Sequence, residues 1–405
     1  MLAFGCKKPY KIYGTKASPV PLLLQKLNLT HFRGYETLRL DLGGARMAVF
    51  TGANGAGKTN ILEAVSLLIP GKGLRGADLL EMKNRGAGAE DLWAVSAEVE
   101  TASGLNVRLG TGLDRDFKRR VVRIQGKEAK AQNELSSFVS CVWLTPQMDR
   151  LFLEGASSRR KFFDRLVYAF EPGHITRLNH YDTNLRERLK LLTEHRHSDP
   201  RWLDALETQL AADAVCIASS RLNLLSRLAH YVSQLGQGRT LFPLPYISLS
   251  GWTESEIQRQ PALAVEEALK ERFKQSRGLD AHSGKSHEGI HRSDFLVRYA
   301  AKDMPADQCS TGEQKGLLLS IVLAHALMMR GEKGFVPVLL LDEVAAHLDD
   351  ARRDEIFNIL SSLDGQVFLT GTDPGIFSQL KNTARFYHVE GATVTAKPML
   401  ESVAK

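Results

Sequence analysis

The order of hydrophobic and polar residues predicts strands followed by a helix in the first third of the chain. Residues 22–41 contain two short apolar segments around a turn at residues 32–35, and the apolar run 47–50 leads directly into a glycine-rich loop. Apolar residues at helical spacing follow over residues 60–69 and stop at a Pro-Gly pair. Residues 93–125 alternate between apolar and polar with glycines between the runs, which predicts antiparallel hairpins. This part of the chain is therefore expected to be mixed α/β.

The middle of the chain has a different pattern. Residues 150–235 contain almost no glycine and include long amphipathic stretches over residues 158–170, 175–195 and 202–235. Apolar residues at heptad spacing are not sustained over three or four heptads in any of these stretches, so a long coiled coil is not expected. The pattern predicts a compact helical insertion.

The last third returns to α/β alternation. Residues 278–291 are rich in glycine, serine and histidine and are predicted to form a mobile loop. A helix over residues 311–330 and buried strands at 336–341 and 366–370 are expected after it. The pattern therefore predicts an α/β head that is split by a compact all-helical arm.

Four segments follow from these boundaries. They are a flexible basic N-terminal extension over residues 1–21, the first part of the head over 22–148, the helical arm over 149–285, and the second part of the head over 286–405. No function is assigned to the extension.

The composition indicates a basic protein and an intracellular location. The chain has 43% hydrophobic and 24% charged residues, which is enough for a sizeable core, and its formal net charge of +7 suits a polyanionic partner such as nucleic acid. Its four cysteines match neither a zinc spacing nor a disulfide framework. The sequence shows neither a secretory signal nor an apolar stretch of membrane-spanning length. A cytoplasmic protein without membrane association is expected.

The glycine-rich loop carries the first chemical motif. It matches the eight-position phosphate-binding P-loop, or Walker A motif, in which backbone N–H groups surround phosphates. Lys58 is expected to reach the β- and γ-phosphates, and the Thr59 hydroxyl is expected to bind Mg²⁺. The predicted ATP-binding residues are Gly52, Ala53, Asn54, Gly55, Ala56, Gly57, Lys58, Thr59 and Asn60.

A second motif is an apolar strand that ends in two carboxylates. Such a strand fits a buried parallel sheet whose carboxyl end opens on an active site. Asp342 is expected to bind Mg²⁺, directly or through water, and Glu343 to orient and deprotonate the attacking water. The structural alternative is a core strand followed by a solvated acidic turn, and the P-loop favours the catalytic interpretation.

A third motif occupies residues 310–315. Ser310 and Glu313 have the spacing of a capping box, which by itself only starts a helix. A capped helix N-terminus with a glycine beside it, here Gly312, also presents N–H groups and a hydroxyl to an anion. Both interpretations use the same geometry.

Taken in order, these motifs resemble those of ABC-type ATPases. The order is a Walker A loop, a Ser-x-Gly-Glu signature, a Walker B strand ending at Asp342, and a loop over residues 346–349. The resemblance implies that the signature of one subunit closes on the ATP held by another. Ser310 and Gly312 would then act in trans, and Asp349 would lie at the joint.

Within this class the chain resembles the RecF family from about residue 22 onward. The segments that carry the resemblance are residues 32–35, 52–64, 155–164 and 289–294. The resemblance implies a monomer that dimerises on ATP and binds gapped DNA or single-strand–double-strand junctions. It also implies RecO- and RecR-like partners and a RecA-like recombinase that is loaded onto DNA.

Three positions leave alternatives open. The strand 366–369 is followed by Thr370 and Gly371, where many ABC ATPases have a γ-phosphate-sensing histidine, so slow hydrolysis is expected. Gln147 either senses Mg²⁺ and the γ-phosphate, as a Q-loop glutamine does, or has no such role. Arg33 resembles an arginine that the family places near the nucleotide, but a surface arginine in a turn is common.

A basic cluster in the arm is the candidate DNA surface. Its members are Arg159, Arg160, Lys161 and Arg165, which form either a solvated helix face or a contact with the phosphate backbone.

Two other functions of the whole protein are alternatives. One is a transporter's nucleotide-binding subunit, which the long separation of P-loop and signature disfavours. The other is a scaffold that binds ATP without hydrolysing it.

Overall fold

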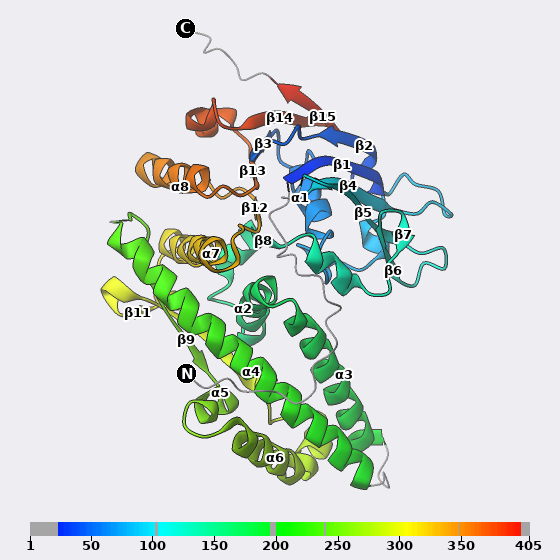
Figure 1. Ribbon diagram of the computed structural model, residues 1–405, viewed down its shortest axis with the longest axis vertical. Helices are drawn as coiled ribbons and strands as arrows, with labels where there is room; N and C mark the ends of the chain where they lie inside the picture. The colour runs from blue at the N-terminus through cyan, green and yellow to red at the C-terminus, as the bar shows by residue number, and fades with distance from the viewer. Residues whose placement is uncertain (1–22, 102–103, 195–199, 239, 347, 398–405) are drawn as a thin grey trace.

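The computed structural model describes residues 23–397 except 102–103, 195–199, 239 and 347. The N-terminal extension 1–21 and His347 of the 346–349 loop therefore lie outside the described residues. In the described part, a head formed by two large sheets lies above a helical arm (Figure 1).

The first sheet confirms the predicted hairpins. It is antiparallel, with strand order β2-β1-β4-β5-β6-β7. Its strands are β1 Leu23–Phe32, β2 Tyr35–Asp41, β4 Ala94–Glu100, β5 Asn106–Leu113, β6 Arg120–Ile124 and β7 Lys127–Glu128. Alternate residues of these strands are buried, so one face packs on the core and the other meets solvent.

The second sheet is mostly parallel and carries the strand predicted before the P-loop. Its order is β15-β14-β3-β13-β12-β8. Its strands are β3 Met47–Thr51, β8 Cys141–Leu144, β12 Val338–Leu341, β13 Val367–Gly371, β14 Arg385–Glu390 and the antiparallel β15 Thr393–Lys397. β3, β8, β12 and β13 are buried throughout, as their continuous apolar runs predict.

Two hydrophobic cores lie on the two faces of this second sheet. One face packs with helix α1 Lys58–Ser66 and the inner side of the antiparallel sheet. The other face packs with helices α7 Thr311–Lys333 and α8 Asp350–Ser362, which Figure 1 shows on the opposite side from α1. Apolar side chains of the sheet point to both faces. Because β3, β13, β12 and β8 run in parallel, their carboxyl ends share one edge, and the motif residues follow them there.

The arm contains the predicted helices but is not all-helical. Its helices are α2 Ala156–Phe170, α3 Gly173–Glu194, α4 Pro200–Gln237, α5 Trp252–Ile257 and α6 Ala262–Ser283. Strand β9 Pro245–Ser250 lies within the same range and pairs with β10 Asp294–Tyr299, which pairs in turn with β11 Met304–Pro305. The prediction was wrong here because the partner strand comes only after α5 and α6, and a six-residue strand without a neighbouring partner is hard to tell from a loop.

Residues 278–291 do not form the predicted loop throughout. Helix α6 continues to Ser283, and Asp280 accepts hydrogen bonds from Arg188 at 2.6 Å and from the backbone N–H of His287 at 3.0 Å. The Nδ1 atom of His291 lies 3.0 Å from the Tyr181 hydroxyl oxygen. Asp280, His287 and His291 are thus hydrogen-bonded within the arm, whereas residues 282–285 are exposed.

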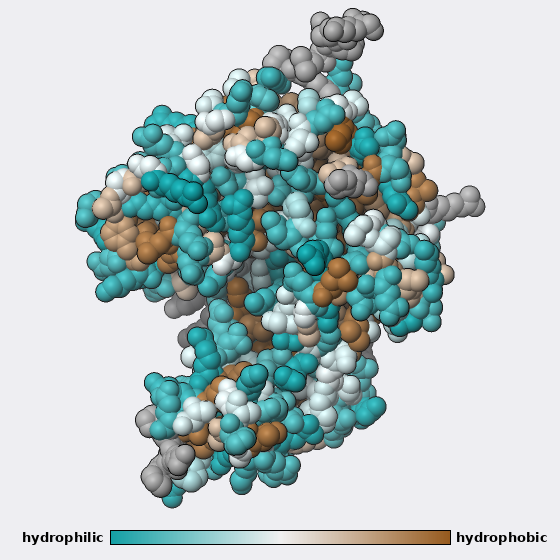
Figure 2. Space-filling model, turned by 180° about the vertical axis from the view of Figure 1, so that it is seen from behind, coloured by the Kyte–Doolittle hydropathy of each residue, from teal (hydrophilic) through white to brown (hydrophobic). Residues whose placement is uncertain are grey.

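Short 3₁₀ helices connect the larger elements. They are η1 Leu80–Met82, η2 Gln132–Ser137, η3 Pro146–Arg150, η4 Ile290–Arg292, η5 Ala300–Lys302, η6 Ala306–Gln308 and η7 Pro374–Leu380. The face opposite that of Figure 1 is predominantly hydrophilic and narrows between head and arm (Figure 2). Among the described residues, no helix has the length and apolar character needed to cross a membrane.

Candidate functional site

The P-loop connects the end of β3 to the start of α1. Gly52 and Gly57 have φ angles of 153° and 110°, in the region that favours glycine. The Tyr35 hydroxyl donates a 3.1 Å hydrogen bond to the Gly57 carbonyl. A Cβ atom on Gly57 would lie 2.7 Å from that hydroxyl, and one on Gly52 would lie 2.1 Å from the Val389 carbonyl oxygen. Close packing and backbone conformation therefore both require these glycines.

Lys58 is buried at the centre of the P-loop. Its ammonium group donates hydrogen bonds to the carbonyl oxygens of Gly52, at 2.7 Å, and Ala53, at 2.8 Å. Burial lowers the pKa of Lys58, while the negative charges of Glu343 and Asp342 raise it. The loop thus holds a cation close to both predicted carboxylates.

Asp342 follows the last residue of β12, and its carboxylate contacts the P-loop helix α1. The Thr59 hydroxyl donates to the two carboxylate oxygens of Asp342, at 3.1 and 2.9 Å. The parallel order β3-β13-β12 brings these residues together, although 283 positions separate them. The Asp342 carboxylate is nearly buried and also accepts a 2.6 Å hydrogen bond from the Thr370 hydroxyl.

These oxygens suit a Mg²⁺ ion that is shared with phosphates. Mg²⁺ prefers six oxygen ligands and is usually held by one or two protein groups plus phosphate and water. Thr59 and Asp342 are such groups, and the described residues contain no cluster of three or more His, Cys, Asp or Glu side chains that would hold a metal alone. Thr59 and Asp342 therefore fit a Mg²⁺ ion that is bound together with a nucleotide.

Glu343 has an unusual backbone conformation. Its φ angle is +51°, which is uncommon for a residue other than glycine. Its N–H donates to the Thr370 hydroxyl at 2.9 Å, and its carbonyl oxygen accepts from the Lys315 ammonium at 3.1 Å. Neither Thr370 nor Lys315 was a predicted site residue. Lys315 ends the 310–315 motif and Thr370 stands where many ABC ATPases have a histidine, but nothing in either segment indicates a contact with Glu343, 28 and 27 positions away.

The signature residues lie at the exposed start of α7. The Ser310 hydroxyl accepts from the Glu313 N–H at 3.3 Å, and the Ser310 N–H donates to the Glu313 carboxylate at 2.9 Å. This confirms the predicted capping box. The hydrogen bond from Lys302, followed by that from the Ser310 backbone, lowers the pKa of Glu313 to about 2. Gly312 is exposed, with open space where a Cβ would be, so the predicted contact in trans is sterically open.

Asp349 caps the next helix. Its carboxylate accepts a 2.9 Å hydrogen bond from the Arg352 N–H at the start of α8, and the side chain is exposed. Gln147 is also exposed, on η3 directly after β8. Because β8 pairs in parallel with β12, Gln147 lies at the same edge of the sheet as Asp342. Nucleotide contact by either residue stays a prediction.

Arg33 is held against α1. Its guanidinium donates to both carboxylate oxygens of Glu63, at 2.9 and 2.6 Å, and Glu63 is fully buried. Arg75 donates to Glu63 at 3.1 Å and to Asn60 at 3.0 Å. The structure therefore gives Arg33 a clear structural partner, and its contact with nucleotide stays a prediction.

The basic cluster in the arm is not one open face. Arg159 forms a two-point ion pair with Asp294, at 2.8 and 2.7 Å, and Arg160 donates to the Ser293 carbonyl. Arg165 lies over the ring of Trp143, 4.2 Å from its centroid, and burial lowers its pKa to about 10. Lys161 alone among the four is exposed. Arg159 and Arg165 therefore have partners within the fold, and DNA contact by the four residues stays a prediction.

A cavity of about 540 Å³ adjoins the P-loop. Residues 53–57 and Asn60 form one wall, and residues 388–392, the end of β14 and the turn before β15, form the other. β14 and β12 lie on opposite sides of β3.

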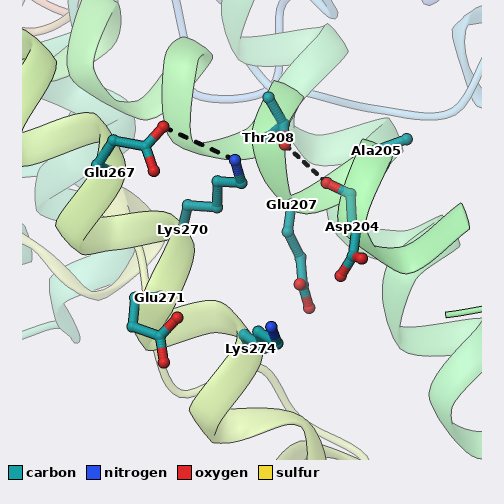
Figure 3. A pocket seen from close by; sticks show the side chains of 8 residues that line it. All are labelled: Asp204, Ala205, Glu207, Thr208, Glu267, Lys270, Glu271 and Lys274. Atoms are coloured by element: carbon teal, nitrogen blue, oxygen red, sulfur yellow. Dashed lines mark hydrogen bonds and ion pairs between the residues drawn. The ribbon is translucent and has the colours of Figure 1, made fainter. Parts of the chain in front are cut away.

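A second cavity, of about 450 Å³, lies on the arm between α4 and α6 (Figure 3). Asp204 and Glu207, which line it, each accept from Arg277 at 2.5 Å, and Lys270 lies 3.7 Å from Glu267. It has no glycine-rich backbone and none of the predicted site residues. This cavity is not a candidate for the nucleotide site.

Comparison with known proteins gives a consistent result. The family model described as RecF/RecN/SMC N terminal domain matches residues 23–395. The "DNA replication and repair protein RecF" of Mesorhizobium japonicum is 44% identical over 379 residues, which cover 93% of this chain and 98% of that protein. The protein of the same name from Caulobacter vibrioides is 44% identical, with 92% and 97% covered.

Solved structures show the same fold. The recombination mediator protein RecF-ATPrS in the RecFOR pathway superimposes with a TM-score of 0.81 at 24% identity, covering 94% of this chain and 99% of that one. An Smc head domain from Pyrococcus furiosus, with an extended coiled coil, has a TM-score of 0.52 at 15% identity and covers 93% of this chain. The mixed α/β ATPase head predicted from the sequence is thereby confirmed.

Proposed function

We propose, starting from the fact that this chain belongs to the RecF family of ABC-type ATPases, that it is an ATP-gated DNA-binding protein of replication and recombinational repair. The observation that carries the proposal is the convergence of Lys58 and Thr59 with the carboxylates of Asp342 and Glu343. A cation, a hydroxyl and two carboxylates at a P-loop are the groups that phosphoryl transfer requires.

Each of these groups has a role in ATP hydrolysis. Lys58 neutralises charge on the β- and γ-phosphates, and the P-loop N–H groups bind their oxygens. Thr59 and Asp342 would hold Mg²⁺, which would supply positive charge to the phosphates during their transfer. Glu343 orients the attacking water and takes its proton. Hydrolysis is expected to be slow, because β13 ends in Thr370 and Gly371 and offers no imidazole to the γ-phosphate.

The complete site requires two subunits. Ser310, Gly312 and Asp349 are exposed on the surface, where they can meet the ATP of a second copy. Closing two copies around two nucleotides supplies the difference in affinity that a ligand-driven change must have. ATP therefore joins the subunits in this proposal, and hydrolysis releases them.

Mixing two inactive variants tests the composite site. Ser310→Arg should bind ATP but fail to dimerise or hydrolyse it, and Lys58→Ala should not bind it. In a heterodimer both lesions fall in one site, so the other keeps an intact Lys58 and an intact Ser310. The mixture is expected to regain ATPase activity that neither variant has alone, with a dependence on both concentrations.

The opposite outcome is also defined. Heterodimers that form without regained turnover would show that hydrolysis needs both sites or that Ser310 is only a helix cap. A cysteine at the exposed Asp350 separates these outcomes by crosslinking. A cap alone predicts that Ser310→Arg still gives the ATP-dependent crosslink.

DNA is the proposed partner of the closed dimer, on gapped duplex or at single-strand–double-strand junctions. Support comes from the net charge of +7 and from relatives named as DNA replication and repair proteins. RecR- and RecO-like mediators and a RecA-like recombinase are the proposed protein partners, because two similar solved structures are described as recombination mediator proteins of the RecFOR pathway. Within the arm, Lys161 is the proposed phosphate contact, and the partly buried Arg160 is the second candidate.

DNA binding should require ATP and weaken steeply with salt, because phosphate contacts release counterions. Lys161→Glu is expected to lower the affinity for all sequences alike and to reduce the slope of log affinity against log salt concentration by about 1. Lys381→Glu, an equal charge change at an exposed head residue, is the matched control. Parental affinity and salt slope in Lys161→Glu would move the DNA surface away from α2.

A further inference from the structure

We infer that Lys315 and Thr370 are positioning residues that hold the backbone of Glu343 from both sides and so aim its carboxylate at the attacking water. This inference rests on the proposed role of Glu343 as the general base. The observation behind it is that both polar groups of the Glu343 peptide backbone have a side-chain partner, one on β13 and one on α7.

The Glu343 backbone needs such support. With φ at +51°, the residue adopts the left-handed conformation, which costs energy for any side chain with a Cβ. Strained backbone of this kind persists only where surrounding contacts fix it, and it gathers at functional sites. Glu343 directly follows Asp342, whose carboxylate accepts hydrogen bonds from Thr59 of the P-loop helix, so the strained residue lies at the predicted active site.

Thr370 holds the N-terminal side of the strained residue. Its hydroxyl donates to Asp342 Oδ1 at 2.6 Å and accepts from the Glu343 N–H at 2.9 Å. A hydroxyl has a single proton, so its donation to Asp342 leaves a lone pair for Glu343. One buried side chain therefore fixes the Mg²⁺ carboxylate and the backbone of the base together.

Lys315 holds the C-terminal side. Its ammonium donates to the carbonyl oxygens of Glu343, at 3.1 Å, and Ala346, at 2.8 Å. The Glu343 carbonyl also accepts from the Ala346 N–H at 3.1 Å, so the ammonium closes a turn over residues 343–346. Lys315 is 9% exposed, and burying an ammonium is costly unless its hydrogen bonds are made within the protein.

Lys315 also connects the base to the signature. It lies in the first two turns of α7, the helix that Ser310 caps. A shift of this helix start would move the carbonyl oxygens that Lys315 holds, and with them the Glu343 backbone. Ser310, which is proposed to contact the ATP bound to the partner subunit, is thereby linked to Glu343 of its own subunit.

Four variants test the inference by separating turnover from binding. Lys315→Met and Thr370→Val keep the size of the side chain but remove its hydrogen bonds, while Lys315→Arg and Thr370→Ser can restore them. Both disruptive variants are expected to lower kcat by about 10- to 100-fold, the effect of a small misplacement of a reacting group. Their ATP affinity should stay within about threefold of the parent, because neither side chain belongs to the P-loop. Thr370→Ser and, to a lesser degree, Lys315→Arg should recover turnover.

Mg²⁺ titration distinguishes the two residues. Thr370→Val should raise the Mg²⁺ concentration for half-maximal turnover, because Asp342 loses a partner. Lys315→Met should leave it unchanged, because Lys315 contacts only backbone carbonyls. Ser320→Ala, which removes a buried 2.9 Å hydrogen bond of α7 to Pro243, is the control and should keep parental kcat.

Three outcomes would overturn the inference, and they can be told apart. If the parent hydrolyses ATP in a Glu343-dependent manner but Lys315→Met and Thr370→Val match its kcat, the positioning role of Lys315 and Thr370 is wrong and the proposed function stands. If the parent shows no turnover with or without DNA, the proposed ATPase function fails as well. Loss of turnover in Ser320→Ala to the same degree would also overturn it, by showing that any disturbance of α7 has this effect.

Discussion

The Glu343→Gln variant is expected to bind ATP like the parent protein and to hydrolyse it about 10²- to 10⁴-fold more slowly, the usual contribution of a general base. The amide has the shape of the carboxylate but cannot accept the proton of the attacking water. The backbone contacts with Thr370 and Lys315 remain, so the loss reports on the side chain alone. Single-turnover hydrolysis and equilibrium ATP titration measure the two quantities separately.

The matched control is Glu267→Gln, on the arm and away from the P-loop. It makes the same chemical change at an exposed side chain and should leave both quantities unchanged. Parental turnover in Glu343→Gln would show that Glu343 is not the base, and the role given to the residues after β12 would need revision.

The Lys58→Ala variant should lose nearly all ATP affinity. The Lys58 ammonium is buried among P-loop carbonyls, and truncating one partner of a buried charge pair costs about 2–5 kcal/mol. This corresponds to roughly 30- to 5,000-fold weaker binding. Lys58→Arg is also expected to fail, because a planar guanidinium does not fit the position of a compact ammonium. Calorimetric titration with ATP measures the loss.

Lys72→Ala is the control for this loss, since Lys72 is an exposed lysine of the head. It should bind ATP with parental affinity. Unchanged affinity in Lys58→Ala would contradict the P-loop assignment, whatever the other variants show.

The parts of the fold predicted from sequence have strong local signals. The buried strands β3 and β12 are continuous apolar runs, and the hairpins of the antiparallel sheet show regular alternation. The arm helices α2, α3 and α4 show helical periodicity over many turns. Strand β9 was missed because its partner, β10, is distant in sequence, and a six-residue strand alone resembles a loop.

The candidate site shows the same division. Lys58, Thr59, Asp342 and Glu343 were predicted from motifs, and the structure places them together. Thr370 and Lys315 were missed because their importance lies in hydrogen bonds across the fold. The sequence could not show that Arg159 is paired with Asp294, 135 positions away, so its charge was assigned to DNA.

The central claim is that ATP joins two copies of this chain, and the molar mass of Glu343→Gln in solution tests it most directly. Light scattering during size exclusion should be recorded with ATP and Mg²⁺, with ADP and Mg²⁺, and without nucleotide. The account predicts a dimer with ATP and a monomer in the other two conditions, because this variant retains ATP at both interfaces. A monomer in all three conditions at saturating ATP, or a dimer that does not respond to nucleotide, would contradict it.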